Sequence, residues 1–487
     1  MKKYILIVYL IAGTIGSCSD DFFDKEPTTK LSSGTFWRTP KDAELGLAGV
    51  YSTLGKTPIG TSRIAMLDAI SDNGWSQYNN DDGKLQEIAN GIITAQTGGI
   101  ISEMWNQHYS GIAACNVFIK NVEDITMEDT IKNRYKAEVM FLRAQYYFWL
   151  AQFFGDVPLI LEQLTIETMK QPRVAYADVI SAIYGDLDFA IANLPDEAYS
   201  GHAVKASALA LKARIKLFNG EFSDAAQEAK EIIDDGKFGL YNKDTLSYLN
   251  LFSSDGGQKN NQEIIFSVKF LRPDITNNIQ ERMGRYTAME PLDNFMDEFE
   301  TGDLRKTLVL MDTINNTWWP AGVALGTPSF KSNVWQSPTG FGIRKWSPIN
   351  YDLIKSNWDA DIPLMRYAEV LLNYAEAQNE ILGPDQSVYD AVNQVRARAN
   401  LPPLTGLDKD SMRKAIRYER RIEMCFEGQR WMDLKRWNLA GKVIPQIPIN
   451  FREPNGAKRV WKDAYYYWPV QQNELDKDTN LKQTPGY

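Results

Sequence analysis

Apolar side chains recur every three or four residues over long stretches of the chain, a spacing that predicts amphipathic helices. Residues 39–54 and 103–122 each show one apolar face. The most extended pattern covers residues 131–154 and ends at Gly155, with Pro158 beyond it, and both residue types are stop signals for a helix. These patterns predict a mainly α-helical chain.

Two further stretches predict pairs of helices joined by tight turns. Residues 207–233 hold two helical patterns that meet at an Asn-Gly pair, and residues 366–401 hold two more that meet at a Gly-Pro pair. Small Ala213 and Ala225 flank the first turn, and small side chains there let paired helices approach closely. Both stretches resemble tetratricopeptide-type helical hairpins. We therefore expect such hairpins to form the scaffold.

Between the two hairpins, from about residue 255 to residue 361, the helical patterns fade. Gly, Pro, Asn and Thr accumulate, and the segment EIIFSVKF at residues 263–270 predicts a short strand. So much irregular chain inside a compact protein is typical of functional loops. We expect irregular insertions and a few short strands to form a ligand face on the helical scaffold.

The stretch ERRIEMCFEGQRWMDLKRW, residues 419–437, concentrates acids and arginines. On a helix, Glu419, Glu423 and Glu427 are four residues apart and share one face, where like charges repel. We expect a partly buried row that arginines neutralise, because the planar guanidinium suits buried carboxylates. Four arginines are the expected partners: Arg420 and Arg430 close by, and Arg396 and Arg398 one hairpin earlier.

The alternative is that these carboxylates belong to a surface glycosidase. That chemistry needs two carboxyl groups about 5–9.5 Å apart, one of them with a raised pKa. Glu419 and Glu423 on one helix face can meet the distance. Nearby arginines lower carboxylate pKa values, however, which is the wrong direction for a general acid. A structural clamp is the favoured interpretation, and no catalytic residue is predicted.

The N-terminus combines two basic residues with an apolar run of twelve, too short for the roughly 20 residues that cross a bilayer. Residues 1–17 therefore predict a secretory signal peptide. Small Gly16 and Ser17 directly precede Cys18, an arrangement that resembles a bacterial lipobox. Cleavage there would leave acyl chains on Cys18 as a membrane anchor. Residues 18–34 would then be a lipidated N-terminus and polar tether.

Composition excludes several function classes. The net charge of −9 argues against nucleic acid as a partner, since a phosphate backbone needs a basic surface. His108 and His202, the only histidines, have no zinc-ligand pattern around them. Cys115 and Cys425 lie in apolar helical contexts and are expected to be buried thiols. With no glycine-rich phosphate loop in the sequence, neither a metal nor a cofactor is predicted.

Several of these motifs follow one another as they do in a known family. Residues 419–437 resemble the C-terminal signature of the SusD/RagB family of outer-membrane nutrient-binding lipoproteins, and residues 36–54 resemble its first helix. Further segments resemble the family in its order: 17–27, 137–160, 210–222, 366–380, 395–401 and the closing 465–487. The chain is identified on these motifs as a member of the family.

The resemblance implies a role as well as a fold. It implies a single SusD-like domain over residues 35–487 and a position on the outer face of the outer membrane. Family members act there as a hinged lid that captures glycans over a SusC-like, TonB-dependent barrel transporter, without catalysis. Asp20 and Asp21, just after Cys18, resemble the family's surface-export signal.

Ligand residues are not carried by the family motifs, so we sought them among aromatic side chains in loop sequence. Aromatic faces suit the C–H face of a sugar, and neighbouring polar side chains can bind its hydroxyls. The candidates are Trp75, Tyr78, Asp72, Asn73, Trp318, Trp319 and Trp335. The adjacent pair Trp318-Trp319 is the best of them. Four tryptophans in helical segments are expected in the core: Trp105, Trp149, Trp431 and Trp437.

Three alternatives remain open at this stage. The same architecture can bind peptides, since aromatic loops serve either ligand. A surface glycosidase using Glu419 and Glu423 would cut its ligand. A helical scaffold without a small ligand would use the aromatic loops only for assembly with a partner. The sequence does not identify the glycan.

Overall fold

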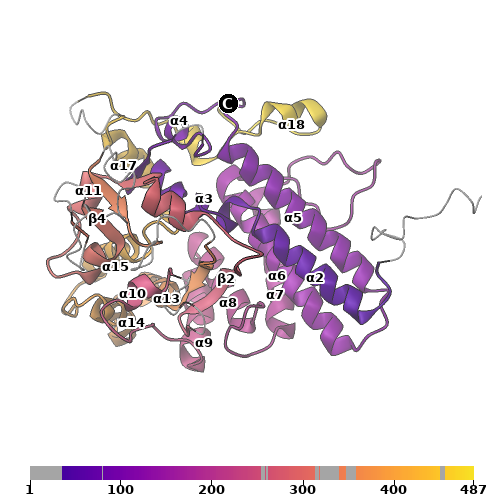
Figure 1. Ribbon diagram of the computed structural model, residues 1–487, viewed down its shortest axis with the longest axis horizontal. Coiled ribbons are helices and arrows are strands. Elements are labelled where there is room, and N and C mark those ends of the chain that lie inside the picture. The colour runs from indigo at the N-terminus through magenta and orange to yellow at the C-terminus, as the bar shows by residue number, and fades with distance from the viewer. Residues whose placement is uncertain are drawn as a thin grey trace, which may run out of the picture.

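Figure 1 shows the computed structural model of the chain, which describes residues 36–78, 81–253, 258, 261–312, 317–318, 339–346, 358–449 and 456–487. The predicted signal peptide and tether, together with Trp319, Trp335 and the side chain of Trp318, lie outside the described residues. Within the described ranges, no helix has both the length and the apolar character needed to cross a membrane.

Four long helices gather at one end of the molecule (Figure 1). They are α2 (Pro40–Leu54), α5 (Ile100–Val122), α6 (Asp129–Phe154) and α7 (Tyr176–Asn193). Helix α6 packs against each of the other three, and almost every side chain in its second half is buried. This end of the molecule is therefore a helical layer built around α6.

The ends of these helices follow local sequence signals. Thr39 caps α2 through a reciprocal pair, because its hydroxyl accepts the Asp42 N–H at 3.3 Å while the Asp42 carboxylate accepts the Thr39 N–H at 2.8 Å. Helix α6 ends at Gly155, whose φ of 71° is a conformation that glycine adopts readily. The helix predicted for residues 131–154 and its stop are confirmed.

Both predicted helical hairpins are present. The first is α8 (Lys205–Phe218) with α9 (Phe222–Asp235), and the second is α13 (Tyr367–Leu382) with α14 (Gln386–Arg398). Helix α13 packs on α9, which joins the two hairpins, and on α15 (Lys409–Glu423). The mainly α-helical fold class with a hairpin scaffold is confirmed.

Among the described residues, the strands form three small antiparallel sheets. One pairs β1 (Gly74–Ser76) with β3 (Met289–Pro291), and another pairs β2 (Ile264–Val268) with β7 (Ile362–Arg366). In the third, β4 lies between β5 and β6: Leu310–Asp312, Thr317–Trp318 and Phe341–Ile343, respectively. The strand predicted within residues 263–270 is β2, and all five of its residues are buried.

Short helices complete the irregular regions. They are α3 (Arg63–Met66), α4 (Leu85–Ala89), α10 (Ser247–Asn250), α11 (Asp293–Met296), α12 (Leu304–Val309), α16 (Arg430–Arg436), α17 (Ala440–Val443) and α18 (Gln472–Lys477). Cys115 and Cys425 are free, buried thiols, and burial raises the pKa of Cys425 to about 12. The expectation of two buried thiols is confirmed.

Candidate functional site

The row of glutamates is a buried ion-pair cluster. Glu419 and Glu423 end α15 with no exposed surface, and Glu427 follows in the next turn, also buried. Five cations from other parts of the chain surround them: Arg305, Lys345, Arg366, Arg396 and Arg398. Burial alone would raise the pKa of Glu423, but the surrounding arginines outweigh it and lower that pKa to about 2.

Sequence reasoning found two of these five cations. Arg396 reaches Glu419 at 3.2 Å, and Arg398 pairs with Glu423. It missed Arg305, Lys345 and Arg366, which enter the cluster from α12, from the chain after β6 and from β7. The sequence around these three cations does not indicate their role, because the glutamates that they contact are more than 50 positions away.

Arg420 and Arg430 do not neutralise the glutamate row, which corrects the expectation drawn from their spacing. Arg420 instead pairs with Asp433 at 2.8 Å, and Arg430 pairs with Asp72 at 2.8 Å. Arg420 is three residues before Glu423 on α15, but its guanidinium donates instead to Asp433, Asn373 and Gln429. Helix α15 also ends at Glu423, so the i, i+3 spacing from Glu427 to Arg430 is not a helical one.

The geometry of Glu419 and Glu423 does not suit a glycosidase. The two oxygens of Glu419 accept from Arg305 at 2.5 Å and Arg396 at 3.2 Å, and those of Glu423 accept from Arg366 at 3.0 Å and Arg305 at 3.2 Å. Burial raises the pKa of Glu419. A raised pKa is of no use to a general acid that no substrate can reach, and this carboxyl is fully buried.

The cluster holds both ends of the three-stranded sheet. Arg305 lies on α12, which runs directly into β4, and it donates to Glu419. Lys345 follows β6 by two residues, and its ammonium donates to Glu427 at 2.6 Å and to the Cys425 carbonyl at 2.7 Å. The buried charges therefore attach the insertion to α15 and the turn after it.

A second set of ion pairs fixes the chain before β1. The Asp72 carboxylate accepts from Arg430 at 2.8 and 2.9 Å and lies 3.1 Å from Arg421. Asn73 accepts from Arg421 at 2.9 Å and donates to Asp68 at 3.0 Å. Helices α15 and α16 thus hold β1 as well as the β4–β6 sheet.

These contacts correct the assignment of Asp72 and Asn73 to sugar hydroxyls. Both side chains are buried, and their polar atoms are already engaged. Burial would raise the pKa of Asp72, but Arg430 and Arg421 outweigh it and lower that pKa to about 2. In the sequence the two residues look like part of an exposed loop, because the arginines that bury them are more than 300 positions away.

Strand pairing joins distant segments that carry candidate aromatic residues, and we call this assembly of β1, β3, β6, β4 and β5 the aromatic face. Trp75, half-buried, lies in β1 opposite Glu290 of β3. The Glu290 carboxylate accepts the Thr339 N–H at 2.9 Å, just ahead of β6, and β3 packs on β6. Across β6 and β4, the backbone of Trp318 in β5 lies opposite Met311. The strands therefore place Trp75 and the backbone of Trp318 in one continuous assembly.

Polar side chains that the sequence did not indicate lie beside Tyr78 and Gln77. The Arg282 guanidinium is 6.0 Å from the centre of the half-buried Tyr78 ring and pairs with Asp82. Thr287 donates to the side chain of Gln77 at 3.3 Å. These groups reach the face only through the pairing of β1 with β3, which the local sequence does not encode.

The chain has a scaffold of helical hairpins, and irregular insertions held by ion pairs carry aromatic side chains. This is the architecture of a binding protein. The chain belongs to the SusD family. The SusD family model matches residues 252–487, and a second model, described as starch-binding associating with outer membrane, matches residues 21–217.

Similar proteins match all or nearly all of the chain. SusD-like protein P2 of Formosa agariphila is 28% identical, and the match covers 100% of both chains. A SusD-like protein of Bacteroides fragilis has a similar structure, with a TM-score of 0.79, 25% identity and coverage of 95% of this chain and 100% of its own. A laminarin-binding SusD-like protein matches with a TM-score of 0.77, 25% identity and coverage of 92% and 100%.

Proposed function

We propose that this protein is a cell-surface lipoprotein that captures oligosaccharides and delivers them, as a hinged lid, to a SusC-like TonB-dependent barrel transporter in the outer membrane. Membership of the SusD family is the observation that carries the proposal. The laminarin-binding relative supports a glycan as the ligand. Acyl chains on Cys18 would supply the membrane anchor.

The proposed binding surface is the aromatic face around Trp75 and Tyr78, extended by Trp318, Trp319 and Trp335. A ring that lies half-exposed on a short strand can stack on the C–H face of a sugar. Arg282, beside Tyr78, takes the place of Asp72 and Asn73 as a donor for hydroxyl groups. The buried clamp below holds the strands and takes no part in contact with the ligand.

The proposal is for capture without catalysis. The candidate carboxylates Glu419 and Glu423 are enclosed by arginines, and the bound sugar should therefore remain intact.

Calorimetric titration of the purified mature chain with a panel of neutral hexasaccharides tests the proposal. Binding of one sugar class is expected, and Trp75→Ala or Trp318→Ala/Trp319→Ala should weaken it about tenfold or more, because each change removes a stacking surface. Trp461→Ala is the matched control, a half-buried tryptophan that packs against Trp431 outside the face.

Three results would count against this function. Shortened sugar in the recovered ligand would restore the glycosidase interpretation. Binding of peptides in place of sugars would move the chain to the peptide alternative. Equal losses in the Trp75 and Trp461 variants would show that the aromatic face is not the binding surface.

A further inference from the structure

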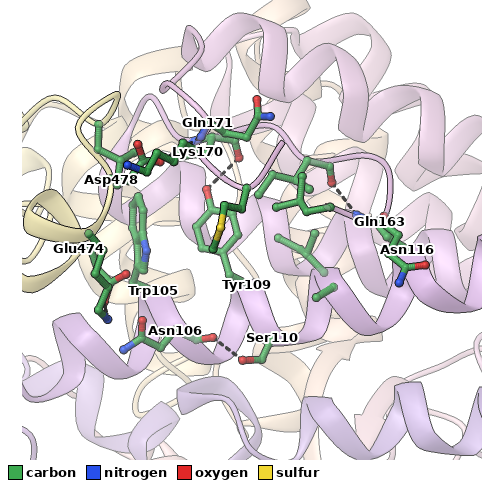
Figure 2. A pocket seen from close by; sticks show the side chains of 18 of the residues that line it. Trp105, Asn106, Tyr109, Ser110, Asn116, Gln163, Lys170, Gln171, Glu474 and Asp478 are labelled. Carbon is green, nitrogen blue, oxygen red and sulfur yellow. Dashed lines mark hydrogen bonds and ion pairs between the residues drawn. The ribbon is translucent and has the colours of Figure 1, made fainter. Parts of the chain in front are cut away.

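A groove lies at the helical end of the molecule, apart from the aromatic face. It is bounded by α5, by the segment 158–171 that follows α6, and by α18 with the residues after it (Figure 2). Its volume is about 540 Å³, within the range of roughly 300–1,000 Å³ typical of small-molecule sites. None of its lining residues belongs to a β-strand.

Two aromatic rings form part of the floor of the groove. Trp105 and Tyr109 are one turn apart on α5, and their ring centres lie 5.0 Å apart at an angle of 55°. Figure 2 shows both side chains pointing from α5 towards the segment above. Trp105 was expected in the core, and it is largely buried, yet it also lines this cavity. Ile112 and Ala113 continue the floor along the helix.

The segment above the groove is an arch held at its two ends. The Asn116 amide donates to the carbonyls of Ile160 at 2.9 Å and Glu162 at 3.2 Å, and the Gln171 N–H donates to Asp478 at 3.0 Å. Between these points, residues 163–169 form hydrogen bonds, among the described residues, only with one another and with Gln171. Among the described residues, the middle of the arch can therefore lift without breaking a hydrogen bond to the scaffold.

The groove is lined by both charged and uncharged polar groups, and the exposed side chains of Glu162 and Lys170 form no ion pair within the described part of the chain. Glu474 is paired with Lys477 at 2.9 Å, and Asp478 already holds the arch. The side-chain amides of Asn106 on the floor and Gln163 on the arch have no hydrogen-bond partner within the described part of the chain, and both residues are exposed. An amide can donate and accept at once, which matches the hydroxyl groups of a neutral ligand.

We propose that this groove is a second oligosaccharide site, which takes a short stretch of neutral sugar over Trp105 and Tyr109. The inference deepens the glycan-capture function proposed above and rests on it. The two rings would stack on the C–H faces of the sugar. Asn106 on the floor and Gln163 on the arch would bind its hydroxyl groups. Two sites on one chain would strengthen the retention of a long glycan without any change in either contact.

Methyl NMR on the mature chain tests the proposal, because Met169 of the arch lines the groove and reports on it directly. The Met169 ε-methyl signal is assigned from Met169→Leu. It should shift on addition of at least one of laminarihexaose, maltohexaose, cellohexaose and xylohexaose. The shift should persist in Trp75→Ala/Trp318→Ala, which alters the aromatic face alone.

Variants of the groove complete the test. Asn106→Ala/Gln163→Ala should weaken the titration followed at Met169 about tenfold, since two hydrogen bonds are lost. Ala113→Trp should abolish it by filling the exposed floor. Gln227→Ala is the matched control, an exposed amide on α9 outside the groove, and should leave the titration unchanged.

The outcomes separate this proposal from the function on which it rests. A Met169 signal that no hexasaccharide moves overturns the second site, even where calorimetry shows binding at the aromatic face. A shift that survives Ala113→Trp overturns it too, because the sugar would then act from elsewhere. A shift caused by tri-leucine peptide and by none of the sugars replaces the glycan with a peptide. A Met169 shift without calorimetric loss in the Trp75 variant supports the groove and counts against the aromatic face.

Discussion

Glu423 is in contact with Arg305, Arg366 and Arg398 although no part of it reaches solvent. The buried glutamates and the buried arginines need one another, because moving an ion out of water without a partner of opposite charge costs several kcal/mol. The cluster is thus strongly interdependent: the charge of one residue determines whether several others can stay buried.

Glu423→Gln should therefore destabilise the fold by about 3 kcal/mol, because it keeps the shape of the side chain and takes one counter-charge away from three buried arginines. Urea unfolding followed by circular dichroism measures the change. Glu44→Gln, in an exposed pair with Lys41, should cost less than about 1 kcal/mol. A loss at Glu423 no greater than that at Glu44 would contradict the clamp.

The same carboxylate predicts a pH dependence. Its pKa is about 2 in the folded chain against an ordinary value of 4.5. The stability that it contributes is fully present above pH 4.5 and is lost as the pH falls towards 2. Between these values, the free energy of unfolding of the wild type should fall more steeply than that of Glu423→Gln. Parallel curves would show that Glu423 titrates normally.

At the scale of elements, α15 and α16 hold short strands that would not form stable sheets alone. Strands β4, β5 and β6 have two or three residues each, too few for a sheet to be stable alone. Arg305 and Lys345 fix the two ends of this sheet, and Arg430 fixes the chain before β1. These charged contacts therefore fix the strands that carry Trp75 and the backbone of Trp318.

Lys345→Met should loosen the β4–β6 sheet while leaving the helices intact. It removes the donor to Glu427 and to the Cys425 carbonyl. We expect amide hydrogen exchange in Phe341–Ile343 to accelerate about tenfold and exchange in α8 to stay unchanged, as local opening requires. Lys477→Met, on the exposed α18, serves as the control. Uniform acceleration through the chain would point to global destabilisation instead.

At the scale of the whole molecule, the helical layer around α6 and the clamped insertions lie at opposite ends (Figure 1). The proposed aromatic face belongs to one end and the groove beneath residues 158–171 to the other. Described residues begin at 36, next to α2 in the helical layer. A lipid on Cys18 would tether the whole domain to the membrane through the residues between Cys18 and α2.

Cys18→Ser should release the protein from membranes, since a serine at this position cannot carry a thioether-linked lipid. Fractionation of cells and mass spectrometry of the N-terminal peptide measure the change. Cys115→Ala, at a buried thiol, should remain with the membrane fraction. Retention of the Cys18 variant on membranes would mean that something other than this lipid anchors the chain.

A feature of the structure could be predicted from the sequence where the pattern that indicates it is local. The period of apolar residues and the turn residues beside them are local, so α6, both hairpins and strand β2 could be predicted with nearly their observed bounds. The acids of the buried cluster could also be singled out. Their partners could be predicted only in part: Arg396 and Arg398 were found, whereas Arg420 and Arg430 were assigned to the wrong acids because helix ends and side-chain directions were unknown.

The sequence by itself determined a mainly helical scaffold, the family, and a carboxylate row that needs positive charge. Only the tertiary structure decided that Arg305, Lys345 and Arg366 supply part of this charge, and that Asp72 and Asn73 belong to the clamp rather than to the ligand. The physical reason is that helices form from neighbours along the chain. Buried charges are instead satisfied by whichever residues the packed helices and strands bring within a few ångströms, whatever their separation in sequence.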